Sequence, residues 1–286
     1  MIAGLVSALL LSAPAMAPAV AEALATGDAH YAERAAGARN GVARTGPIDA
    51  AIAAYRRALN LDPGSYAARL RLLRAMFFRG GFCDIAPKEQ IRLFEEAKRL
   101  ADDTVRRLET DLKIPRLSAH REALRREPLA AEIYLWAAVS WGQWATTHKL
   151  GAVWQGAARQ IRDLAQAVVE IEPQTLYGSG HLILGRLHAE APRIPMLTPW
   201  VSREKAIEHL TKALQIAPDN TSNIYFLAEA LLSLRPARRS EVRSLLERCV
   251  SAPPRPDFLV EDAHYAEEAR QLLAQSFGPS GEARGR

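Results

Sequence analysis

Apolar and small residues recur along most of this chain at the three- and four-residue spacing of amphipathic helices. Two stretches, 49–63 and 204–218, repeat one order of small, large, small and proline positions, with steps of four, three and five residues. The small residues let a neighbouring helix approach closely, the large one fills the space between helices, and the proline ends the helix. The pattern predicts helix pairs packed in a repeating order. Its positions are Ala51, Tyr55, Ala58 and Pro63 in the first copy and Ala206, Leu210, Ala213 and Pro218 in the second.

This order resembles the second helix of a tetratricopeptide (TPR) repeat. In the partner helices, we expect Gly80 to mark the end of a helix and Gly185 to allow another helix to cross. The resemblance implies an all-α, TPR-like α-solenoid, in which each hairpin buries its apolar face against its neighbours. No segment combines β-branched alternation with turn dipeptides, so no sheet is expected.

The spacing predicts about five helical hairpins and a C-terminal capping helix within one repeat domain, residues 22–277, followed by a disordered tail, 278–286. Residues 113–128 contain two prolines and many charges, which indicates a long connection with a short helix. The predicted pairs are 22–37 with 49–61, 66–79 with 88–112, 130–147 with 155–171, 178–190 with 202–216, and 222–234 with 240–250, and the last helix is 261–276.

The N-terminal residues have the composition of a secretory signal peptide. Residues 2–13 are apolar and uncharged, and Ala19-Val20-Ala21 is a small-x-small cleavage pattern before Glu22, the first charged residue. No Lys or Arg precedes the apolar stretch, so a buried or mobile helix is the alternative. We predict a signal peptide over residues 1–21 and a soluble, periplasmic mature protein, since no lipidation cysteine follows.

Charge and chemical motifs exclude several functions. The net charge is +5, and Arg-rich faces such as that of Arg69, Arg71 and Arg74 are interpreted as solvated surface, so no nucleic-acid partner is expected. Cys83 and Cys249 are expected to be unpaired, because residues so far apart in a solenoid rarely touch. The chain has no nucleophile elbow, phosphate loop or CxxC motif, and we expect a non-enzymatic protein without a cofactor.

His181 and His188 share one face of a predicted helix, where they raise the question of a metal site. No acidic or cysteine ligand stands near them at metal-site spacing, so no metal site is expected.

The loop at residues 191–200 is longer than a TPR connection and contains three prolines together with large apolar residues. Such a loop either covers core or lines a ligand cavity or a protein contact. All five tryptophans lie between residues 136 and 200, and several share one helix arc with His148. They either fill a wide gap between hairpins or wall a binding cavity with His148 at its edge. On the second hypothesis, the ligand-binding residues are Trp136, Trp141, Trp144, His148, Trp154, Met196 and Trp200.

From about residue 25 to 274, the order of features resembles the T component of tripartite ATP-independent periplasmic (TRAP) transporters, the TatT family. The matching segments are 49–63, 177–188 with its proline-containing loop, 205–218 followed by 225–232, and 261–274. The resemblance implies an exported accessory protein with an apolar cavity for a hydrophobic small molecule, which docks a periplasmic solute-binding protein and forms a trimer.

The chain departs from that family in two places. It lacks the lipobox cysteine, and residues 197–200 read Leu-Thr-Pro-Trp where the family usually has a Gly-Gly pair. The alternative function is a general TPR scaffold that captures a peptide or a partner helix on its concave face.

Overall fold

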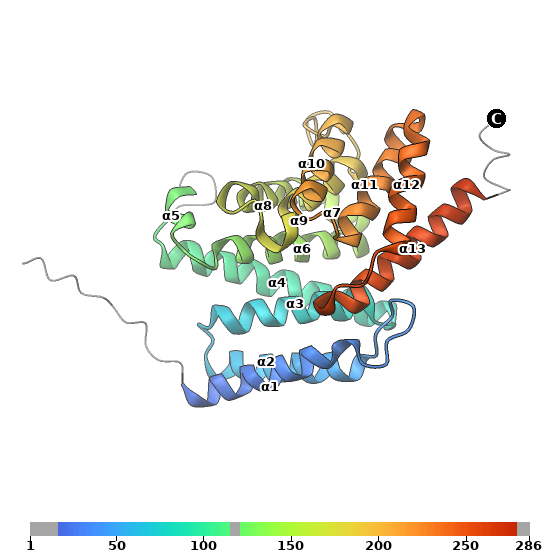
Figure 1. Ribbon diagram of the computed structural model, residues 1–286. Coiled ribbons are helices and arrows are strands. Elements are labelled where there is room, and N and C mark those ends of the chain that lie inside the picture. The colour runs from blue at the N-terminus through green and yellow to red at the C-terminus, as the bar shows by residue number, and fades with distance from the viewer. Residues whose placement is uncertain (1–16, 115–120, 279–286) are drawn as a thin grey trace, which may run out of the picture.

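The computed structural model describes residues 17–114 and 121–278, which form helices and short connections (Figure 1). Within these ranges the only β-type pairing consists of two isolated bridges, so the expectation of an all-α fold is confirmed. The elements are α1 (Pro18–Ala32), η1 (Glu33–Ala35), α2 (Thr45–Leu61), α3 (Tyr66–Phe82), α4 (Pro87–Asp111), α5 (Arg121–Arg125), α6 (Ala130–Thr147), α7 (Lys149–Trp154), α8 (Ala157–Ile171), α9 (Thr175–Glu190), α10 (Arg203–Ile216), α11 (Thr221–Leu234), η2 (Pro236–Arg238), α12 (Arg239–Ser251), η3 (Pro256–Phe258) and α13 (Leu259–Phe277).

The helices stack as five hairpins, which confirms the TPR-like solenoid. The pairs are α1 with α2, α3 with α4, α6 with α8, α9 with α10, and α11 with α12, and α13 packs on α11 and α12. The predicted short helix between the second and third hairpins is α5. One detail differs, because the start predicted at residue 155 is preceded by a separate helix, α7.

The repeat residues occupy the contacts that the spacing predicts. Tyr55 and Leu210 are fully buried. The small positions of the repeat are fully buried too, namely Ala51, Ala58, Ala206 and Ala213. A Cβ on Gly185 would lie 2.5 Å from Leu210 Cγ, so the expected helix crossing is confirmed. Gly80 has a different role from the one predicted: α3 continues to Phe82, and a Cβ at Gly80 would lie 2.2 Å from the Phe94 ring. Glycine there permits close packing and does not end the helix.

Helix α13 runs back from the last hairpin to α3, as Figure 1 shows. Its Glu261 forms an ion pair with Arg34 at 3.6 Å, and its His264 ring meets Phe82 edge-on at 5.2 Å. Gly41, in the link before α2, has a φ of +74°, and a Cβ there would lie 2.3 Å from His264 Cα. The first and last parts of the chain are therefore in direct contact.

Other predictions concern the ends of the chain and the cysteines. Residues 1–16 and 279–286 lie outside the described residues, and the signal peptide and the tail stay predictions. Cleavage after Ala21 would fall inside α1 and remove its buried Val20. Cys83 and Cys249 are both free, as expected. Over the described ranges, we find no helix with the length and apolarity needed to cross a membrane.

Candidate functional site

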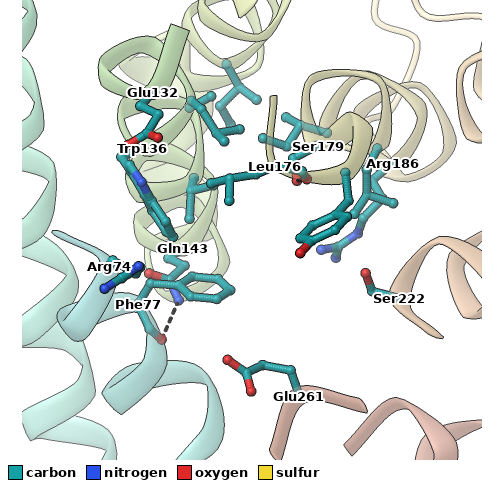
Figure 2. A pocket seen from close by; sticks show the side chains of 18 of the residues that line it. Arg74, Phe77, Glu132, Trp136, Gln143, Leu176, Ser179, Arg186, Ser222 and Glu261 are labelled. Carbon is teal, nitrogen blue, oxygen red and sulfur yellow. Dashed lines mark hydrogen bonds between the residues drawn. The ribbon is translucent and has the colours of Figure 1, made fainter. Parts of the chain in front are cut away.

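The first helices of the hairpins surround a cavity of about 1470 Å³. This volume exceeds the roughly 300–1,000 Å³ of sites that hold one drug-sized ligand. Helices α1, α3, α6, α9 and α11 contribute to its wall, together with α8 and α13. Much of the wall is apolar, and its aliphatic part includes Leu135, Val139, Ile161, Leu176, Ile183 and Leu187. Figure 2 shows side chains from these separate helices pointing into one space.

Gly142 lines the cavity at a point where the wall has no side chain. It lies in the middle of α6, where glycine costs about 1 kcal/mol relative to alanine. A Cβ at this position would meet no atom within 4 Å, so no neighbouring helix requires the glycine. Gly185 offers the contrast, because its missing side chain is replaced by Leu210. The effect of Gly142 is to keep space open in the cavity.

The end of the cavity near α1 and α3 carries charge. The ring of Tyr31 has two guanidinium groups over it, with Arg34 Cζ at 4.3 Å and Arg74 Cζ at 4.2 Å from its centroid. Arg34 is paired with Glu261, and burial raises the pKa values of both Tyr31 and Glu261. This end of the cavity can hold a polar group, while the aliphatic wall cannot.

Tyr177 also lines the cavity, and its ring meets Phe258 edge-on at 5.3 Å. Leu176, Tyr177 and Gly178 all have positive φ, so α9 is kinked where it begins. Asn223, which is fully buried, donates from Nδ2 to the Tyr177 carbonyl at 3.1 Å and thereby holds the kink. The sequence placed the helix start at Gly178 but gave no sign of the two preceding residues in this conformation.

Of the predicted site residues, Trp136 lines the cavity and contacts Phe77 at a ring distance of 5.7 Å. Trp141, Trp144 and His148 do not line it. Trp141 Nε1 donates to Asp102 Oδ1 at 2.7 Å, and Trp144 stacks on His148 at 4.7 Å. These rings face α4, because its acidic side chains supply partners for their polar atoms.

The remaining predicted residues lie elsewhere. Met196 is 96% exposed, and Trp200 packs against His188 at 5.4 Å and beneath Arg162 at 4.6 Å. The side chain of Trp154 lies outside the described part of the structure. Trp136 is therefore the one described member of the set that lines this cavity. Whether the other six residues bind a ligand stays a prediction.

The sequence interpretation missed the arginines. Arg69, Arg71 and Arg74 were expected on solvated surface, but Arg69 is buried and donates to Asp103 at 2.7 Å. Arg71 and Arg74 line the cavity, on the same face of α3 as Phe77. The available signal was this spacing of Arg, Arg and Phe at three-residue steps, which places all three on one helix face.

Three histidines meet between α9 and α10, outside the large cavity. His181 Nδ1 and His209 Nδ1 lie 2.9 Å apart, and the rings of His188 and His209 stack at 6.0 Å. Burial lowers the pKa of all three, and that of His209 falls to about 4. Within the described chain no three metal-ligating side chains are grouped for an ion.

The chain was compared with family models, with curated proteins and with solved structures. No family model matches the chain, and no curated protein matches it. Among solved structures, it is similar to the TPR2AB domain of yeast Sti1 in complex with pHSP90, with 13% sequence identity and a TM-score of 0.32 over 90% of this chain and 97% of that one. The superposition is loose, and the repeat class rests on the hairpins described above.

Proposed function

We propose that this protein is a non-enzymatic binding protein that holds an apolar small molecule inside its helical solenoid. The cavity of about 1470 Å³ supports this function, because an aliphatic wall gains free energy when an apolar ligand displaces water from it. The return of α13 to α3 favours an internal ligand over an open groove.

The test is to fill the cavity at Gly142. We expect Gly142→Phe to place a ring in the open space without a backbone clash and to weaken binding of the uncharged fluorescent probe N-phenyl-1-naphthylamine by about tenfold or more. Gly142→Ala is the matched control, since it adds a single methyl group to the same position. Equal probe affinity in both variants and the wild type would contradict the proposal.

We further propose that the protein is exported and serves as an accessory partner of a periplasmic solute-binding protein, as the TatT resemblance implies. The observation that favours a protein contact is the tip of the 191–200 loop. Met196 there is 96% exposed with a φ of +68°, and Leu197 beside it is 59% exposed. Exposed apolar side chains on a strained backbone are more typical of contact surfaces than of solvated loops.

This partnership can be tested by co-purification from the periplasmic fraction. We expect wild-type protein to retain a solute-binding protein and the double variant Met196→Ser, Leu197→Ser to lose it with unchanged melting. Sedimentation of both proteins tests the trimer that the resemblance implies. Recovery of an extended peptide instead would favour the alternative, a TPR scaffold that captures a peptide or partner helix.

A further inference from the structure

We propose that Arg74 selects ligands with an anionic head group, a carboxylate or phosphate carried on an apolar chain. The head group binds the Arg74 guanidinium beside Tyr31, and the chain extends along the aliphatic wall. This inference rests on the proposed function, because the chain would occupy the same cavity. The inference adds the chemical class of the ligand and names the residue that recognises its head group.

Arg74 differs from the other arginines at this end of the cavity because it has no acidic partner. Arg71 Nε lies 2.8 Å from Asp28 Oδ1, and Arg34 is paired with Glu261. For Arg74, no carboxylate of the described residues lies within ion-pair distance, and its Nε is buried without a hydrogen-bond acceptor. A guanidinium without a carboxylate partner can bind an oxyanion through its terminal N–H groups.

The balance of charge at this end also favours an anion. Three arginines, at positions 34, 71 and 74, face two carboxylates, Asp28 and Glu261, which leaves a net charge of about +1. Four other carboxylates line the cavity. Asp262 and Glu190 are paired with Arg255 and Arg186. Asp257 is exposed, and Figure 2 places Glu132 beyond the Trp136 ring from Arg74.

The geometry sets the direction of the ligand. Arg74 and Phe77 lie on the same face of α3, and Phe77 contacts Trp136 on α6 (Figure 2). The charged end of the cavity is therefore followed directly by an aromatic part of the wall. Burial raises the pKa of Tyr31, whose hydroxyl therefore keeps its proton and can donate to an oxyanion. An amphiphile with its head at Arg74 would bury its chain against α6, α8 and α9.

The experiment compares three probes with the same number of carbon atoms: dodecanoic acid, dodecyl phosphate and dodecanol. Binding is measured at pH 7 by displacement of N-phenyl-1-naphthylamine. For the wild type, we expect the two anions to bind about tenfold or more tightly than the alcohol. In Arg74→Gln this preference should be lost while dodecanol binds as before, and Arg74→Lys should recover part of it. The matched control is Arg57→Gln, an exposed arginine on α2 with the same change in net charge.

The outcomes separate this inference from the proposed function. Equal affinity for the alcohol and the anions in wild type, or an equal loss of all three in Arg74→Gln, overturns the role of Arg74 and leaves the cavity as a binding site. Inorganic phosphate that competes as well as dodecyl phosphate overturns the amphiphile and points to a free anion. Failure of every probe, with no effect of Gly142→Phe, overturns both proposals. Melting curves of each variant confirm that it is folded.

Discussion

At the scale of single residues, polar atoms decide which way the aromatic rings face. The sequence placed Trp136, Trp141, Trp144 and His148 on one helix arc, but Trp136 lines the cavity while the other three rings lie toward α4. The arc could not show that Asp102 and Glu95 of α4 accept hydrogen bonds from Trp141 and His148, at 2.7 and 3.2 Å. Lys98 adds a cation–π contact, 3.8 Å from the Trp141 ring. These partners belong to another hairpin, so periodicity within α6 carries no information about them.

The histidine cluster gives a prediction at this scale. Burial, and then the nearby His181 and His188, lowers the pKa of His209 to about 4 from an ordinary value of 6.5. The unfolded chain therefore binds a proton at higher pH than the folded one. The stability that neutral His209 contributes is complete above pH 6.5, declines as the pH falls, and is lost at about pH 4.

We expect the melting temperature of the wild type to fall more steeply between pH 6.5 and pH 4 than that of His209→Gln, measured by calorimetry in matched buffers. Carboxylates titrate in both proteins, so the difference between the two slopes isolates His209. Parallel slopes would show that the histidine contact does not couple to folding.

At the scale of elements, the repeat spacing predicted the hairpins well, because each small or large position has one neighbour fixed by helix geometry. The bounds of α6 agree with the prediction at both ends, and those of α10 and α11 agree within one residue. Gly80 was misinterpreted because a glycine near a helix end has two explanations, a stop or a close contact. Phe94, on the next helix, decides between them.

Two glycines inside helices should respond in opposite ways to alanine. Gly142→Ala should stabilise the protein by about 1 kcal/mol, since alanine is the better helix former and the methyl group enters open space. Gly185→Ala gains the same propensity, but its Cβ would lie 3.0 Å from the Leu210 backbone nitrogen, so overpacking by about 1–3 kcal/mol outweighs it. Urea denaturation of both variants measures the two free energies of unfolding, and a gain at Gly185 would contradict the helix register.

At the scale of the whole molecule, the two ends of the solenoid are in contact through α13, which also contributes to the cavity wall. The sequence predicted α13 as a cap on the last hairpin, which it is, but not its return to Arg34, Gly41 and Phe82. Small rotations at each hairpin add up along the array, and irregular links such as the connection containing α5 interrupt them. The sequence pattern within one hairpin therefore does not predict the total rotation along the array.

This contact can be opened at Gly41, which does not itself line the cavity. Gly41→Val combines a positive φ, which β-branched residues avoid, with a Cβ 2.3 Å from the His264 backbone, so the link and α13 must separate. We expect the helix content measured by circular dichroism to be preserved, because each hairpin packs on its own neighbours. Dissociation of N-phenyl-1-naphthylamine, followed by stopped-flow fluorescence, should become several-fold faster as the cavity loses its closed side. Gly46→Ala is the control, since a Cβ at that exposed position meets no atom within 4 Å. An unchanged dissociation rate in a folded Gly41→Val protein would mean that the ligand leaves by another route and that closure by α13 does not retain it.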